Sequence, residues 1–344
     1  MNRKERFFKA VKHEEIDRLP VQLDLSPKAI DKITNAVNLE NNELSFLEFF
    51  GNHIVYAYLD DVYGKIKKRT DFKEKIIYDE WGIGWDVEQE GTFLAVHPLA
   101  DLDKYKNYLI PDPNDDELLV TAKDKVNNYS DDYVVCSYQV LCLFEKAWAL
   151  RGLENFMMDM LTNVGFVEDL LDKITDYQVR IAERYVEIGI DCGRTGDDYG
   201  GQSGLMFSPD LWRKLIKPRL KKIWKVYKSA DIPVMHHSCG DVRSIIPDMI
   251  EMGLDILNPI QPEAMPLEEL IQYSSDLTFY GGLSMQHVLP FGSTEEVKQE
   301  VKNAVQLLGK NNAYIIAPSN TINSDVPIEN VKALLEGIEE YNKI

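Results

Sequence analysis

The chain has 344 residues, of which 38 are Lys or Arg and 57 are Asp or Glu, so its formal net charge is −19. Hydrophobic residues make up 44% of it, which excludes a disordered chain, and the length allows one α/β barrel with a single large core. An acidic chain whose longest Lys/Arg tract is Lys67-Lys68-Arg69 lacks the concentrated positive charge that binds a nucleic-acid backbone. We therefore expect no nucleic-acid partner.

Cysteine usage and hydropathy indicate the compartment. Four cysteines at irregular spacing are too few to form a disulfide framework in a chain of this length, so we expect reduced thiols. The first residues mix charged and aromatic side chains without the apolar run of a signal peptide, and no window reaches about 18 uninterrupted apolar residues. We expect a soluble cytoplasmic protein without a membrane partner, and a homodimer is one expectation for its assembly.

Short apolar runs rich in Val, Ile and Tyr alternate with longer stretches of helical periodicity. The eight runs cover residues 19–25, 53–59, 133–138, 188–195, 232–237, 254–259, 277–282 and 313–318. Helix signals between them include periodic apolar residues over 163–186, Ser208 followed by Pro209, and a capping box of Ser293 and Glu296. The pattern predicts one (β/α)8 barrel domain over 1–344 with an N-terminal helical extension, rather than an open doubly wound sheet.

The segment 74–98 departs from this alternation. It carries aromatic and glycine residues in an alternating pattern, including Trp81, Gly82, Gly84 and Trp85. This pattern predicts a β-hairpin inserted into the barrel.

Coordinating side chains gather after the later apolar runs, which is where a barrel of this kind places its active site. His237 and Cys239 follow the fifth run and are separated by one residue, so both can face the barrel mouth and bind a borderline-soft ion such as zinc. The alternative is a buried cysteine beside a hydrogen-bonded histidine. A metal motif also needs at least a third ligand.

Two acidic pairs follow other runs. Asp197-Asp198 can act as acid or base, as a metal ligand or as a substrate acceptor, and the alternative is a helix cap beside a solvated carboxylate. Asp60-Asp61 is weighed in the same way, with Asp61 as the candidate for substrate binding. Tyr138, after the third run, either lines a pocket or packs in the core.

Several catalytic motifs are absent. The sequence has no phosphate-cradling glycine loop, no G-x-S-x-G elbow and no H-E-x-x-H. It also lacks the corrinoid-carrier signature D-x-H-x-x-G, so any corrinoid would come from another protein.

The motifs at the strand ends resemble those of the superfamily of uroporphyrinogen decarboxylases and the cobalamin-linked methyltransferases that share their barrel. The resemblance extends over nearly the whole chain. Its segments are 3–13, 17–21, 149–154, 196–198 with Gln202, 208–213, 217–219, 237–242, 258–262, and Gly281-Gly282 with Gln286.

The decarboxylase branch binds an octa-anionic porphyrinogen in an arginine-lined cleft. The corresponding N-terminal region here has no arginine between Arg18 and Arg69. An octa-anion would meet repulsion on the order of several kcal/mol in an acidic protein without those guanidinium groups. The sequence therefore disfavours porphyrinogen decarboxylation.

The methyltransferase branch looks like enzymes that bind zinc through an H-x-C pair and a further cysteine after the last strand. His237 and Cys239 match the pair, but Asn320 stands at the position of the further cysteine. This departure puts coenzyme-M thiol activation in doubt. Zinc still requires a third ligand, for which Glu263 and Asp198 are the candidates.

Within this branch, the resemblance implies an enzyme that moves a methyl group from a small methylated donor, such as a methyl ether, to cobalamin on a partner corrinoid protein. Asp197 and Asp198 would act at the reacting centre. The substrate-binding candidates are Tyr138, Gln202, Asn258, Gln286 and Asp61. Two alternatives stay open: a decarboxylase or lyase acting on another carboxylic acid, and a non-catalytic binding protein.

Overall fold

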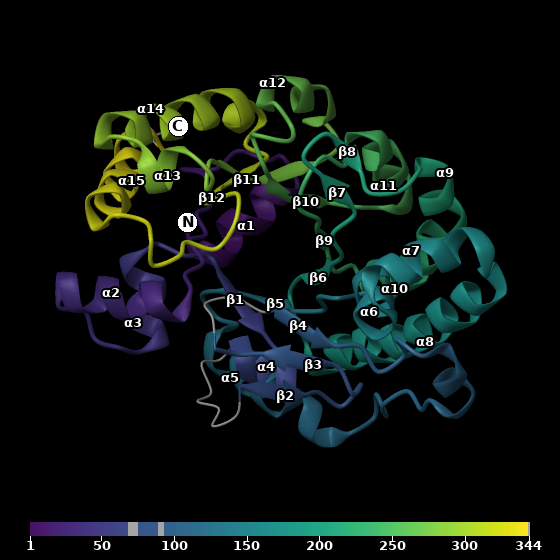
Figure 1. Cartoon of the computed structure of the whole chain (residues 1–344). Coiled ribbons are helices and arrows are strands. Elements are labelled where there is room, and N and C mark those ends of the chain that lie inside the picture. Colours follow the sequence, from purple (N-terminus) through teal and green to yellow (C-terminus); the bar gives the residue numbers. More distant parts are fainter. Residues whose placement is uncertain (68–74, 89–92, 343–344) are drawn as a thin grey trace.

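The computed structural model describes residues 1–67, 75–88 and 93–342, and it forms a barrel of parallel strands surrounded by helices (Figure 1). The barrel strands in the described residues are β1 (Ile54–Ala57), β5 (Val134–Ser137), β6 (Gly193–Gly196), β9 (Val234–His237), β10 (Ile256–Ile260), β11 (Thr278–Leu283) and β12 (Tyr314–Pro318). β1 pairs with β5, and β6, β9, β10, β11 and β12 pair in that order. A bridge between Cys136 and Cys192 joins the two groups.

The first apolar run closes the ring without becoming a strand, which corrects the prediction for 19–25. Val21 bridges both Asn52, just before β1, and Ile316 in β12. Side chains replace part of the backbone ladder here: Asn52 Oδ1 accepts from the Leu23 amide at 2.8 Å, and Gln22 Oε1 accepts from the Ile54 amide at 3.0 Å. The run therefore occupies the eighth position of the barrel through isolated bridges.

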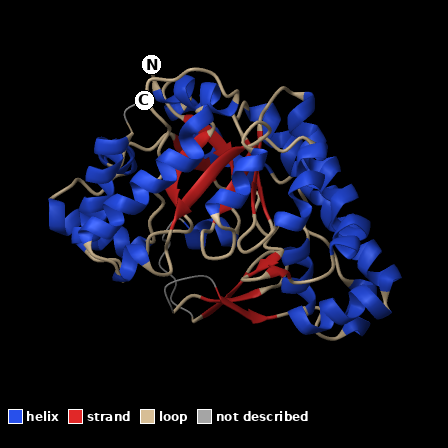
Figure 2. Cartoon of the chain, turned by 90° about the horizontal axis from the view of Figure 1, so that it is seen from above, coloured by secondary structure: helices blue, strands red, loops and turns tan. Residues whose placement is uncertain are grey.

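Helices cover the outside of the barrel (Figure 2). The α-helices are α1 (Arg3–Val11), α2 (Pro27–Val37), α3 (Glu43–Phe49), α4 (Val62–Lys67), α5 (Val120–Tyr129), α6 (Phe144–Arg151), α7 (Leu153–Thr162), α8 (Val164–Ile188), α9 (Pro209–Leu211), α10 (Lys217–Ser229), α11 (Ile246–Met252), α12 (Leu267–Leu270), α13 (Val288–Phe291), α14 (Thr294–Leu308) and α15 (Ile328–Tyr341). Short 3-10 turns lie at Leu102–Asn107, Asp116–Leu119, Arg243–Ile245, Ile271–Tyr273 and Gly309–Asn311, and a π-helical turn at Trp212–Ile216. Among the described helices, none has the length and apolar character needed to cross a bilayer.

The three helix signals in the sequence are confirmed. The periodic stretch 163–186 forms α8. Ser208 accepts from the Leu211 amide at the start of α9, with Pro209 in its first turn. Ser293 and Glu296 form the capping box of α14. These signals succeed because each depends on side chains within one helical turn.

The predicted hairpin at 74–98 is a three-stranded antiparallel sheet, in the order β2 (Ile76–Tyr78), β3 (Gly84–Asp86) and β4 (Phe93–Val96). Residues 74 and 89–92 lie outside the described part of the chain. Asp79 accepts from the Trp85 indole at 2.9 Å and from the Ile83 amide at 2.8 Å, which holds the turn between the first two strands. The prediction missed the third strand. Figure 2 shows this small sheet apart from the barrel strands.

Alternation along the strands determines which side chains enter the barrel. The buried residues that pack together inside it are Phe7, Ile54, Val134, Cys136, Cys192, Met235, Ile256, Tyr280, Ile315 and Ala317. Phe7 comes from α1, so the N-terminal helix contributes to this inner core. The wider apolar cluster lies between the strands and the surrounding helices.

Candidate metal centre

Two adjacent histidines at the end of β9 face opposite sides of the barrel wall. His236 is fully buried toward the helices, where its Nδ1 lies 2.8 Å from Thr195 Oγ1 and its ring stacks on Tyr199. Burial lowers the pKa of His236 to about 3, so this ring stays neutral. The alternation of the strand therefore turns His237 toward the barrel interior.

His237 and Cys239 converge with a carboxylate from the neighbouring strand. His237 Nε2 lies 3.5 Å from Cys239 Sγ and 3.8 Å from Asp198 Oδ1. One ligand atom from each of the three residues lies within 4.8 Å of the other two. Asp198 follows β6, which pairs with β9, so strand order brings the two loops together. This proximity selects Asp198 as the third ligand candidate.

Close backbone contact holds the loops after β6 and β9 in place. Gly240 has φ +78°, and a Cβ on it would lie 2.4 Å from the Gly200 backbone. The Asp241 amide donates to the Gly201 carbonyl at 2.8 Å, and the Cys239 amide donates to Asp198 Oδ1 at 2.8 Å. Only glycine allows this approach, and the contact fixes Cys239 beside Asp198.

Asn258 orients the histidine. Its Oδ1 lies 2.7 Å from His237 Nδ1, and because a carbonyl oxygen only accepts, Nδ1 carries the proton. The Nε2 lone pair then points toward Cys239 and Asp198. This is the outer contact that metal-binding histidines usually have. The sequence placed Asn258 at the substrate, whereas the structure places it behind the histidine.

The donor set fits zinc. Tetrahedral zinc with one nitrogen, one sulfur and one oxygen ligand at its usual bond lengths separates those ligands by roughly 3.3–3.6 Å. The 3.5 Å between His237 Nε2 and Cys239 Sγ falls in this range, and the 3.8 Å between His237 Nε2 and Asp198 Oδ1 lies just above it. The electrostatics also favour a cation: burial and the charges of Asp198 and Glu145 raise the pKa of the Cys239 thiol well above its usual value. A divalent cation would reverse that effect and stabilise the thiolate. Three protein ligands leave a fourth position for a reactant.

Glu145 was missed by the sequence analysis. It lies in the first turn of α6, and burial together with the charge of Asp198 raises its pKa well above its usual value. Glu145 in turn contributes to the raised pKa of Cys239, which places it beside the cluster. Its sequence position, after an apolar run but inside a helix, gave no sign of this proximity.

Asp197 does not share the role predicted for it. It is fully buried, and its carboxylate accepts from the amides of Leu143, Phe144 and Glu145 at 2.7–3.1 Å. Tyr199 donates a further hydrogen bond at 3.0 Å. Both oxygens are thus occupied in capping α6, so the acid candidate at the reacting centre is Asp198 alone.

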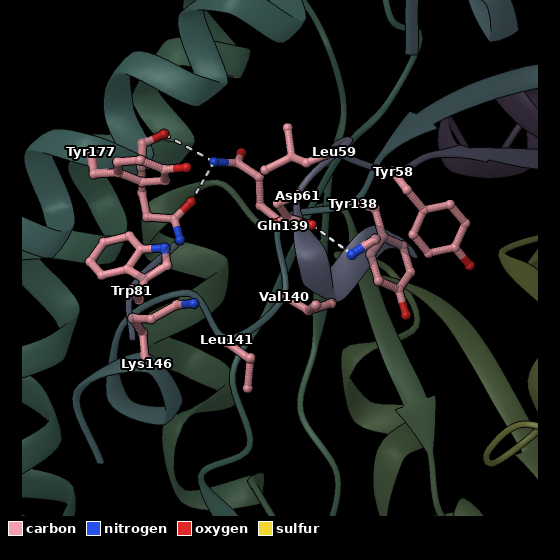
Figure 3. Close-up of a pocket in the computed structure, with 12 residues that line it drawn as sticks. Tyr58, Leu59, Asp61, Trp81, Tyr138, Gln139, Val140, Leu141, Lys146 and Tyr177 are labelled. Atoms are coloured by element: carbon pink, nitrogen blue, oxygen red, sulfur yellow. Dashed lines mark hydrogen bonds between the residues drawn. The ribbon is translucent and has the colours of Figure 1, made fainter. Parts of the chain in front are cut away.

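Tyr138 and Asp61 line a separate small cavity of about 30 Å³ beside the barrel mouth (Figure 3). The Tyr138 ring packs against Tyr58 with centroids 4.3 Å apart, and Lys146 stands over Trp81 on the other side of the cavity. A volume of this size accommodates about one water molecule. Burial and the charge of Glu80 raise the pKa of Asp61 to about 7.

Four other sequence candidates are placed as follows. Gln202 is exposed in the turn between β7 (Gly200–Gly201) and β8 (Gly204–Leu205), and Gln286 is exposed after β11. Glu263 accepts from the Ser284 hydroxyl and is not a member of the cluster found in the described residues. Asn320 does reach the site, with Nδ2 4.0 Å from Cys239 Sγ.

The model of the uroporphyrinogen decarboxylase (URO-D) family matches residues 85–341, three quarters of the chain. The chain belongs to this family. Its fold is also that of a solved methyltransferase from Methanosarcina mazei, with a TM-score of 0.74, 20% identity and 99% of each chain covered. The (β/α)8 barrel predicted from the sequence is thereby confirmed.

Two curated relatives of this URO-D family chain are named as methyltransferases. The methylcobamide:CoM methyltransferase MtaA of Methanosarcina barkeri is 26% identical over 192 residues, which cover 56% of this chain and 54% of that protein. The chain therefore spans about half the length of this relative. The methylcobamide:CoM methyltransferase MtbA of Methanosarcina mazei is 21% identical over 98% of both chains.

Proposed function

We propose that this protein is a zinc-assisted methyltransferase that transfers a methyl group from a small methylated substrate, such as a methyl ether, to cobalamin carried by a partner protein. The observation that carries the proposal is the convergence of His237, Cys239 and Asp198 at the mouth of the barrel. The names of the methylcobamide-linked relatives support the reaction class.

Zinc in this site would act as a Lewis acid on the oxygen that loses the methyl group. His237, Cys239 and Asp198 would hold it, and Asn258 would keep His237 in the ligating tautomer. In the reaction, the oxygen–methyl bond breaks and the oxygen keeps its electron pair. The carbon–cobalt bond forms with the electron pair of cob(I)alamin. The protein's task is to stabilise the departing alkoxide or phenolate.

The number of thiolates among the ligands affects which kind of substrate zinc would activate. Asn320 faces Cys239 where a second thiolate would otherwise lie. Zinc with nitrogen, oxygen and a single sulfur ligand is a stronger Lewis acid than a thiolate-rich centre, because less negative charge reaches the ion. This favours activation of an ether oxygen over activation of a thiol substrate.

The test has two parts. Protein purified without chelator should contain close to one zinc per chain, and His237→Ala should contain little. The loaded protein should convert cob(I)alamin to methylcobalamin, followed by absorbance, in the presence of at least one member of a panel of small methyl ethers.

Less than about a tenth of an equivalent of zinc in both proteins would refute the metal centre. Release of carbon dioxide from carboxylic acids without methylation of cobalamin would identify a lyase instead. Recovery of metal only in Asn320→Cys would indicate a chain that has lost its chemistry.

A further inference from the structure

Arg194 is a buried cation inside the barrel. It lies in β6, and its neighbour Thr195 accepts a hydrogen bond from Trp224 of α10 at 2.9 Å, so Thr195 faces the helices. Alternation then turns Arg194 inward. The Arg194 guanidinium stacks on the Tyr138 ring at 4.4 Å and on the Tyr56 ring at 5.3 Å.

The guanidinium has unused hydrogen-bond donors. Arg194 is only 5% exposed, and neither Nε nor Nη1 has a hydrogen-bond partner. No ion pair to Arg194 is found in the described part of the chain. Arginine guanidinium groups are almost never buried without a carboxylate or an equivalent set of acceptors, because an uncompensated buried charge costs several kcal/mol.

Asp24 does not fill this role, although its charge interacts with that of Arg194. Its Oδ2 accepts from the hydroxyls of Tyr56 and Tyr280, both at 3.3 Å, and its Oδ1 accepts from Gln22 at 2.9 Å. Burial also raises the pKa of Asp24. Asp24 therefore leaves Nε and Nη1 of Arg194 without an acceptor.

The position of Arg194 relates it to the metal centre. Gly196 pairs with His237 across β6 and β9, and Arg194 pairs with Met235, two residues deeper. Two residues of a strand span about 7 Å, so Arg194 lies one inward-facing layer below His237. The inward-facing Asp24, Tyr56 and Tyr138 near Arg194 are half-buried rather than fully buried.

We propose that Arg194 binds the carboxylate of the methyl donor, and that the substrate of this enzyme is a small methylated carboxylic acid. The carboxylate would accept from the guanidinium of Arg194, whose enclosed Nε and Nη1 have no acceptor in the described residues, and the methylated oxygen would lie toward His237 and Cys239. This proposal rests on the proposed function, whose substrate class it specifies. A planar carboxylate is the anion whose two oxygens match two donors of one guanidinium.

Pairs of probes that differ only in charge test the assignment by titration calorimetry. Methoxyacetate is compared with methoxyacetamide, and 4-methoxybenzoate with 4-methoxybenzamide. The wild type should bind the acid of at least one pair tenfold or more tightly than its amide. Arg194→Met should abolish that preference, and Arg194→Lys should keep part of it.

Arg213→Met removes one positive charge from an arginine that is 43% exposed outside the barrel, and it should leave the preference unchanged. Zinc content equal to that of the wild type shows that Arg194→Met retains the metal centre. If this variant does not fold, the comparison uses Arg194→Lys, for which an unchanged preference for the acid and an unchanged affinity would count against the site.

Equal binding of acid and amide in both pairs, no binding of either, or a preference that survives in Arg194→Met would overturn the assignment. Binding of the acid through Arg194 without methylation of cobalamin would instead leave the carboxylate site standing and refute the proposed function.

Discussion

Two acidic pairs follow barrel strands, Asp60-Asp61 after β1 and Asp197-Asp198 after β6. Asp60 accepts from the amide and hydroxyl of Thr121 at the start of α5, and Asp197 accepts from three amides at the start of α6. The second members accept backbone hydrogen bonds as well: Asp61 Oδ1 accepts from the Gly64 amide at the start of α4 at 2.6 Å, and Asp198 Oδ1 accepts from the Cys239 amide at 2.8 Å. Asp60, Asp61 and Asp197 therefore each cap a helix, and Asp198 is the member of the two pairs that lies in the metal-ligand cluster found in the described residues.

The surroundings of the second carboxylates differ. Asp198 lies beside the nitrogen of His237 and the sulfur of Cys239, which are atoms of the kinds that bind zinc. Asp61 instead lies near Glu80 and Lys146, whose charges act on it in opposite directions. A pair of adjacent acids after a strand therefore does not identify a metal site, and the residues on the neighbouring strand decide which pair can bind one.

The largest expected difference between the two pairs concerns zinc. His237→Ala and Cys239→Ser should lower zinc affinity at least 100-fold, because each removes one of three protein ligands. Asp198→Asn should also weaken zinc binding, whereas Asp61→Asn should not. Competition with a chromogenic chelator measures these affinities. Equal losses in Asp198→Asn and Asp61→Asn would contradict the distinction between the pairs.

Substitution of Asp197 and substitution of Asp198 should change the free energy of unfolding by different amounts. Asp197→Ala should lower the free energy of unfolding by about 2–3 kcal/mol, because it leaves buried amides of the first turn of α6 without an acceptor. Asp198→Ala should lower it less while losing zinc. Urea unfolding of metal-free protein, followed by fluorescence and circular dichroism, gives the comparison. A smaller effect for Asp197→Ala than for Asp198→Ala would reverse the assigned roles.

Substitution of Asn258, which lies behind His237, should lower zinc affinity less than substitution of a ligand does. Asn258→Ala removes the acceptor for His237 Nδ1 and should weaken zinc binding about 10- to 100-fold. Asn258→Asp, which keeps an acceptor, should retain more of the affinity. Unchanged zinc affinity in Asn258→Ala, measured as for the ligand variants, would return Asn258 to the substrate role predicted from the sequence.

The last expected effect is the pH dependence of the free energy of unfolding that Asp61 causes. Its pKa of about 7 in the folded protein exceeds the usual aspartate value of about 4, so between these two pH values the folded state binds a proton that the unfolded state has released. The free energy of unfolding should therefore fall as pH rises from about 4 to 7. Asp61→Asn should flatten this part of the profile.

Urea unfolding at pH 5 and pH 8 measures how much the free energy of unfolding falls in the wild type and in Asp61→Asn. Asp210→Asn, at a residue whose side chain is 94% exposed, controls for the loss of one negative charge. An equal fall in the wild type and Asp61→Asn would show that this carboxylate does not titrate with a raised pKa.

Local signals in the sequence predicted much of the architecture. The caps at Ser208 and Ser293 and the length of α8 follow from side chains within a few residues of each other. The alternation of apolar runs and helices correctly indicated the barrel. The run 19–25 failed as a strand because the side chains of Gln22 and Asn52 take backbone hydrogen bonds, and this depends on contacts about 30 residues apart.

The sequence by itself determined the family, the barrel and the pairing of His237 with Cys239, because strand alternation places residues two apart on the same face. Only the tertiary structure decided that Asp198 and not Glu263 completes the cluster, that Asp197 caps α6 and that Asn258 orients the histidine. It also revealed Arg194 inside the barrel. These assignments depend on which strand ends become neighbours around the ring, and spacing along one chain does not contain that information.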